Sequence, residues 1–127
     1  MTTVLDASAV VELLLERTGP EVVAALGDNA AAPDLAFPEV ASALRRFLHQ
    51  GVLDGPTAAS LLAALLDLPI EIVPSRELIE RAFDFHDRVS VYDACYVALA
   101  ESLDATLLTA DRRLARAHGL PVSVRVL

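Results

Sequence analysis

Four acidic residues stand at the ends of predicted strands and helices: Asp6, Glu39, Asp93 and Asp111. Asp6 directly follows an apolar strand predicted at 3–5, and Asp111 lies two residues past a second one predicted at 106–109. In an open parallel sheet, strand carboxyl ends and helix amino ends gather at one edge, where such folds bind ligands. If these two strands are neighbours, Asp6, Asp93 and Asp111 converge.

Several carboxylates at one sheet edge repel one another, and a hard divalent cation relieves that repulsion. A donor set made only of oxygen selects Mg²⁺, with Mn²⁺ as a substitute, over Zn²⁺ or copper. The histidines at 49, 86 and 118 each fall in the last turn of a predicted helix, and no two have metal-ligand spacing. No Ser-His or Cys-His nucleophile is visible. The chemistry expected of the acids is therefore metal-assisted phosphodiester hydrolysis.

Each acid also has a purely structural alternative. Asp6 and Asp111 could cap the helices that follow them, and Asp93 could complete a Ser-x-x-Asp capping box with Ser90. Glu39 could be a first-turn acid that meets the helix dipole. Capping explains any one acid taken alone, whereas a metal site explains the four together.

Three segments of the chain together resemble PIN-domain ribonucleases of the VapC toxin type: VLDASAVV near the start, PEVASALRR in the middle, and the stretch at 90–113. The resemblance covers residues 3–126. It implies that Asp6, Glu39, Asp93 and Asp111 form the metal site, with the hydroxyls of Ser8 and Thr109 beside it. For Ser8, capping the first helix is an equal alternative.

The resemblance also implies a function and partners. We expect a Mg²⁺-dependent endoribonuclease toxin with an RNA substrate, a cognate VapB-like antitoxin, and a homodimer or a hetero-oligomer with that antitoxin. The helices predicted at 35–49 and 56–66 are the interface candidates. A catalytically inactive PIN-fold binding module and a DNA-directed PIN-like nuclease stay open. A receiver or a haloacid-dehalogenase-like phosphatase is disfavoured, because those families look for a lysine and all ten basic residues here are arginine.

Composition sets further bounds. The 127 residues suit a single PIN domain over 1–127, with 54% hydrophobic residues and a mean hydropathy of +0.48. The longest apolar run, 58–66, is too short to span a bilayer, so we expect no membrane segment and instead a subunit or partner interface. The lone cysteine, Cys95, fits a reducing cytoplasm. A net charge of −8 opposes broad contact with a phosphate backbone but allows a local site where metal ions supply positive charge.

The order of elements predicts an α/β fold, a PIN-like three-layer α/β/α sandwich with a short, mostly parallel sheet of about five strands. The expected strands are 3–5, 30–33, 70–73, 106–109 and 122–126. The expected helices are 7–16, 21–26, one from 34 or 38 to 49, 56–66, 75–86, one starting at Ser90, and 111–118. The helix 56–66 is apolar on nearly every side and should be covered on two faces.

Some residues near the acids have two interpretations. Arg112 is the arginine best placed to hold a substrate phosphate, whereas Arg113 and Arg116 fit a solvated helix flank better. Arg45 and Arg46 count as surface charge unless a groove adjoins them. Tyr92 and Tyr96 lie four residues apart, where they could stack on a base, although core packing with a hydrogen-bonded hydroxyl is the favoured interpretation.

Overall fold

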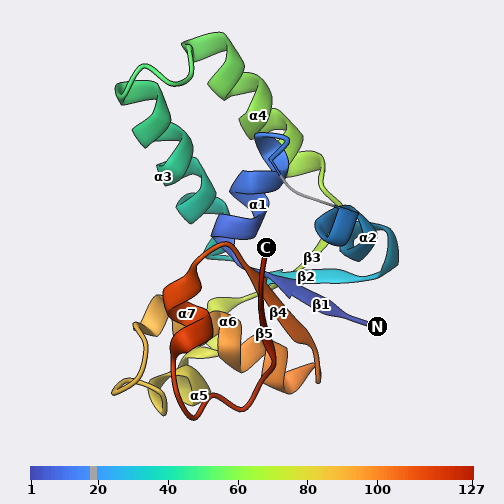
Figure 1. Cartoon of the computed structure of the whole chain (residues 1–127), viewed down its shortest axis with the longest axis vertical. Coiled ribbons are helices and arrows are strands. Elements are labelled where there is room, and N and C mark those ends of the chain that lie inside the picture. The colour runs from blue at the N-terminus through green and yellow to red at the C-terminus, as the bar shows by residue number, and fades with distance from the viewer. Residues whose placement is uncertain (18–19) are drawn as a thin grey trace.

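A central five-stranded sheet organises the chain (Figure 1). The computed structural model describes residues 1–17 and 20–127. The strands lie in the order β3-β2-β1-β4-β5, and every pairing is parallel. Their bounds are β1 Thr3–Leu5, β2 Ala30–Pro33, β3 Ile70–Val73, β4 Thr106–Thr109 and β5 Val124–Val126. The condition set for the acids to converge is met: β1 and β4 are neighbours, and Val4 pairs with Leu107.

Helices cover both faces of the sheet. One layer holds α1 Ala7–Leu14, α2 Pro20–Asp28, α3 Ala36–His49 and α4 Gly55–Asp67, and the other holds α5 Ile79–Phe83, α6 Val91–Ser102 and α7 Arg112–Arg116. Side chains of a strand alternate between these layers. Val4 and Leu107 pack toward α5, α6 and α7, while their neighbours Leu5 and Leu108 pack toward α1, α3 and α4. The predicted three-layer α/β/α sandwich is confirmed.

Several predicted helices are shorter than expected, and one is interrupted. The segment 75–86 forms a 3₁₀ turn, η1 Ser75–Glu77, and then the short α5. After Phe83 the chain continues in turns whose backbone bonds span three residues, which brings Phe85 into the core at 2% exposure. Tertiary packing thus overrides a continuous helical pattern. The first and last helices stop at Leu14 and Arg116, and the last strand begins at Val124.

The prediction that helix 56–66 is covered on two faces is wrong for this chain. Of the residues in α4, only Leu65 is buried, and Leu62 and Leu66 are 40% and 68% exposed. Figure 1 shows α3 and α4 as an antiparallel arm that extends away from α5 and α7. The apolar composition of α4 therefore has no covering partner within the described chain. None of the helices described is long and apolar enough to cross a membrane.

Candidate active site

The four predicted acids lie at one edge of the sheet, near enough for their charges to act on one another. Asp6 follows β1 and caps α1, and Asp111 follows β4 and caps α7. Asp93 and Glu39 lie in the first turns of α6 and α3. Burial raises the pKa of Asp6 and of Glu39. The negative charge of Asp93 raises both pKa values further. The pKa of Asp93 is raised by burial and then by the charge of Asp111.

Asp6 is the most deeply buried of these acids, with 5% of its surface exposed. Its Oδ1 accepts hydrogen bonds from the Ser8 hydroxyl at 2.6 Å and from the Ala9 backbone N–H at 2.9 Å. Its Oδ2 accepts one from the Thr109 hydroxyl at 2.5 Å. These donors stabilise a carboxylate that burial otherwise disfavours, and burial still prevails in the pKa. The carboxylate is therefore held in one orientation at the end of β1.

Ser8 and Thr109 also join the loops that follow the two central strands. The Ala110 backbone N–H donates to Ser8 Oγ at 2.8 Å, and the Asp111 backbone N–H donates to Thr109 Oγ1 at 2.9 Å. The two hydroxyl oxygens lie 3.2 Å apart. Both residues thus lie beside the acids where the sequence analysis expected them, and Ser8 contacts Asp6 instead of capping the helix by itself. Their part in catalysis stays a prediction.

Glu39 is held by a residue from the opposite layer. The buried Tyr96 hydroxyl donates to Glu39 Oε1 at 2.7 Å. Burial and the Glu39 carboxylate raise the pKa of Tyr96, so its hydroxyl keeps its proton and stays a donor. The favoured interpretation of Tyr96 as a core residue agrees with the structure, but the sequence did not reveal its partner. The available signal was general: a buried tyrosine hydroxyl needs a hydrogen-bond partner.

Asp93 and Ser90 form half of the capping box considered above. The Asp93 backbone N–H donates to Ser90 Oγ at 3.1 Å, so Ser90 caps α6 as expected. Among the described residues, the reciprocal bond from the Ser90 N–H to the Asp93 carboxylate is not formed. The Ser90 side chain also lowers the pKa of the neighbouring Asp93, although burial and the charge of Asp111 raise it more.

The arginine that contacts the acids is Arg113, whereas the sequence analysis favoured Arg112. Arg113 Nη2 lies 3.2 Å from Asp111 Oδ2, and the Arg113 backbone N–H donates to Asp111 Oδ1 at 2.9 Å. These bonds lower the pKa of Asp111. Arg112 lines a separate hollow with Glu12 and Ala110, because successive residues of a helix point in different directions. Which of the two arginines contacts Asp111 depends on the rotation of α7 about its axis, and the spacing of residues in the sequence does not give this rotation.

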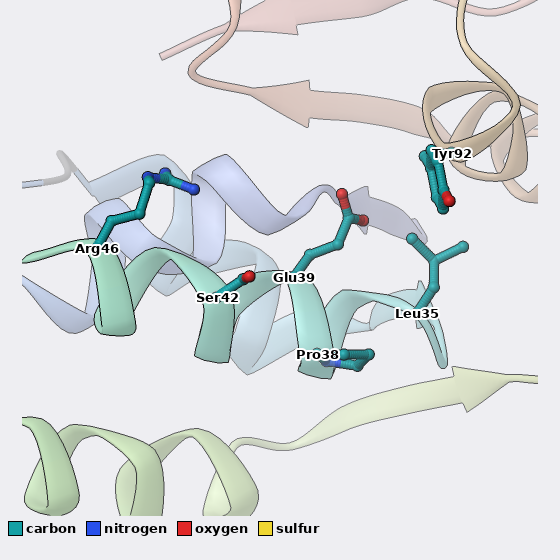
Figure 2. A pocket seen from close by; sticks show the side chains of 6 residues that line it. All are labelled: Leu35, Pro38, Glu39, Ser42, Arg46 and Tyr92. Carbon is teal, nitrogen blue, oxygen red and sulfur yellow. The ribbon is translucent and has the colours of Figure 1, made fainter.

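Two hollows adjoin the cluster, and Glu39 and Arg46 line both. One of about 410 Å³ lies between α3 and the start of α6 (Figure 2); its lining residues are Leu35, Pro38, Glu39, Ser42, Arg46 and Tyr92. The other, of about 290 Å³, lies between α3 and α1 and includes Ser8. Of the four acids, Glu39 is therefore the one that lines this groove along α3. Arg46 borders that groove, so it is more than the surface charge that the sequence suggested.

The donor set at this edge fits a hard cation in its chemistry. Three half-buried or buried carboxylates have raised pKa values, and they are Asp6, Glu39 and Asp93. Bringing a cation among them would offset both desolvation and repulsion. As the side chains stand, no three His, Cys, Asp or Glu residues within 1–17 and 20–127 are arranged to hold a metal ion. Binding would thus require these carboxylates to move closer together.

Comparison with known proteins gives the family. The PIN domain family model matches residues 3–120. Ribonuclease VapC1 of Mycobacterium tuberculosis is 39% identical over 127 residues, covering 97% of this chain and 96% of that protein. The crystal structure of PAE2754 from Pyrobaculum aerophilum shares the fold with a TM-score of 0.67 and 24% identity, over 90% of this chain and 82% of that one.

A further solved structure shares the fold: VapBC2 from Rickettsia felis, bound to a DNA fragment from its promoter. Its TM-score is 0.69 at 14% identity, and the match covers 99% of this chain and 98% of that one. At this identity the likeness speaks for the fold alone. The family model and the 39% identity to VapC1 also show the family. This chain belongs to the PIN-domain family and, within it, to the VapC ribonucleases.

Proposed function

We propose that this chain is a Mg²⁺-dependent endoribonuclease toxin of a toxin–antitoxin pair. The observation that carries the proposal is the convergence of four acids at the carboxyl edge of β1 and β4, where burial and like charge raise the pKa of Asp6, Glu39 and Asp93. The ribonuclease names of relatives such as VapC1 support RNA as the substrate.

The residues that would hold the ion are Asp6, Glu39, Asp93 and Asp111. When bound, a divalent ion supplies positive charge that activates water and offsets charge developing on the scissile phosphate, and Mn²⁺ can substitute for Mg²⁺. Ser8 and Thr109 orient the Asp6 carboxylate from both sides. Tyr96 fixes one oxygen of Glu39. These contacts limit the orientations that the Asp6 and Glu39 carboxylates can take.

Arg113 has a role in the same site. It partly neutralises Asp111 in the metal-free chain, and its attraction also reaches Asp93. With a cation bound to the acids, the guanidinium of Arg113 would be available to a substrate phosphate at the mouth of the site. It is 87% exposed, so this change of partner requires only a side-chain rotation.

The proposed partners are a VapB-like antitoxin and a second copy of this chain. The exposed apolar residues of the α3–α4 arm, including Leu62 and Leu66, support an interface there. Another protein that shares the fold is described as a toxin–antitoxin complex from Klebsiella pneumoniae, which supports the antitoxin by analogy. A cytoplasmic location, inferred from the free and buried Cys95, is part of the proposal.

The test is cleavage of total cellular RNA by the purified, antitoxin-free protein in Mg²⁺ or Mn²⁺, with new 5′ ends mapped across the transcriptome. We expect discrete cuts that disappear in EDTA and in Asp93→Asn. Asp67→Asn, which makes the same change at an exposed acid at the end of α4, is the matched control and should cut like the wild type. Cuts that persist in Asp93→Asn would refute the acidic site. An absence of cuts together with an absence of Mn²⁺ binding would favour a catalytically inactive binding module.

A further inference from the structure

We propose that the hollow between α3 and the start of α6 binds a nucleobase of the RNA next to the scissile bond. In this arrangement Tyr92 stacks on the base, and Arg46 contacts a neighbouring phosphate. The inference rests on the proposed function, because it assumes that RNA is the substrate. It adds a binding site, and the chemistry that this site recognises, to the acidic cluster.

Tyr92 has the properties of a stacking platform. It is 68% exposed, although it directly precedes Asp93 in the first turn of α6. Within the described residues its hydroxyl makes no hydrogen bond, and its ring belongs to no aromatic or cation–π pair. Figure 2 shows it next to Leu35, at the end of the hollow away from Arg46. An exposed aromatic ring beside a nuclease site suits unpaired bases, which proteins bind by stacking on aromatic side chains.

Arg46 supplies positive charge along the same groove. It lies seven residues after Glu39 on α3, two turns or about 10 Å along the helix axis, and both side chains point to the same side in Figure 2. The described residues offer Arg46 no carboxylate within ion-pair distance. In a chain of net charge −8, an arginine without an acidic partner beside an acidic site suits a phosphate.

The rest of the lining suits a base and not a wholly apolar ligand. Leu35 and Pro38 give the hollow apolar surface, and Ser42 gives it a hydroxyl. A nucleobase has apolar faces and polar edges, so it matches this mixture. The volume, about 410 Å³, falls in the ordinary range for ligand pockets. Glu39 belongs both to the acidic cluster and to the lining of this hollow. A base bound in the hollow would therefore be adjacent to the bond that is cut.

The experiment uses a synthetic single-stranded RNA that spans the strongest cut mapped in total RNA, with Mn²⁺ as the metal. Steady-state cleavage is compared for wild type, Tyr92→Ala and Tyr92→Phe, and each is repeated with an abasic nucleotide on either side of the cut. Phe83→Ala is the matched control, since Phe83 is 60% exposed and lies outside the hollow. A second matched pair is Arg46→Gln and Arg45→Gln, because Arg45 lines a different hollow between α3 and α4.

We expect Tyr92→Ala to raise KM roughly tenfold with little change in kcat, and Tyr92→Phe to stay within about twofold of wild type. One abasic substitution should raise KM for the wild type and leave Tyr92→Ala nearly unaffected. Arg46→Gln should raise KM and weaken its dependence on salt, unlike Arg45→Gln. Circular dichroism and unfolding midpoints should match across the set because the Tyr92 and Phe83 side chains are exposed.

Two results would overturn the inference, and they differ from failure of the proposed function. Equal KM values for Tyr92→Ala and Phe83→Ala, in a protein that cuts RNA, would remove the base site and leave the nuclease assignment in place. An equal effect of Tyr92→Ala on intact and abasic RNA would show that the ring contacts no base. A wild type that binds Mn²⁺ yet cuts no RNA would refute both proposals together.

Discussion

Tyr96→Phe tests whether the hydroxyl of Tyr96 holds Glu39 in place. The substitution removes one oxygen atom from a residue that is 1% exposed and keeps the ring that fills the core. It leaves Glu39 Oε1 without the donor now at 2.7 Å. Glu39 then keeps its burial and its repulsion by Asp93 and Asp6 but loses the contact that offsets them.

The size of the effect follows from the kind of bond. A hydrogen bond to a charged group contributes about 1.5–3 kcal/mol. Because Glu39 is only half-buried, water can replace part of the lost contact, so we expect a loss at or just below the lower limit of this range, about 1–1.5 kcal/mol. For a chain of this length that corresponds to a decrease of roughly 4–6 °C in Tm. Mn²⁺ affinity should also fall several-fold, since one oxygen of Glu39 is no longer oriented.

The assay is urea unfolding in EDTA at neutral pH, followed by titration of Mn²⁺ into each folded variant. Tyr92→Phe is the matched control, since it removes a tyrosine hydroxyl from the same helix. Among the described residues, the Tyr92 hydroxyl has no hydrogen-bond partner. A double-mutant cycle with Glu39→Ala should give a coupling of about 1 kcal/mol. The reasoning fails if Tyr96→Phe costs the same in the Glu39→Ala background, or if it unfolds and binds Mn²⁺ like Tyr92→Phe.

Three further predictions follow from the same site. Thr109→Val should lower the free energy of unfolding by about 2–3 kcal/mol, because Asp6 Oδ2 and the Asp111 N–H lose their hydrogen-bond partner. Thr109→Ser keeps the hydroxyl and should lower it by only about 1 kcal/mol, so the urea midpoints of the two variants should differ. Asp111→Asn should abolish RNA cleavage at unchanged stability, since asparagine caps a helix as well as aspartate, whereas Asp111→Ala should also lose about 1 kcal/mol. The raised pKa values of Asp6, Glu39 and Asp93 mean that the folded chain holds protons where the unfolded chain, at the ordinary 3.8 and 4.5, has released them. The metal-free chain should therefore lose stability as pH rises above about 4, and Asp93→Asn should lose less; a stability that rises with pH there would contradict the sign.

The edge of the sheet could be predicted from the sequence because its residues follow strands directly. Each of two short apolar runs is followed by an acid, which predicts that Asp6 and Asp111 lie at the carboxyl ends of strands. In the parallel sheet these two strands are neighbours, so their carboxyl ends lie side by side. Ser8 and Thr109 are two residues from these acids, so their contact with Asp6 needed only correct strand pairing. Local sequence was sufficient where the contacts depend on strand order alone.

Other contacts depend on how distant elements pack. Tyr96 and Glu39 are 57 residues apart, and their hydrogen bond exists because α3 and α6 approach the sheet edge from different layers. The choice between Arg112 and Arg113 depends on the rotation of α7 by a fraction of a turn. Leu66 is a typical core residue type but lies exposed on α4, because no element of the described chain packs over it. Spacing carries none of this information.

The most direct measurement of the central claim is calorimetric titration of Mn²⁺ into the metal-free protein, beside Asp93→Asn and Tyr92→Phe. Asp93 interacts electrostatically with Asp6, Glu39 and Asp111, so its loss removes charge from the middle of the cluster. The account predicts saturable binding to wild type and Tyr92→Phe, and binding at least about tenfold weaker to Asp93→Asn. Saturable binding of equal strength to all three proteins, or none to the wild type, would contradict it.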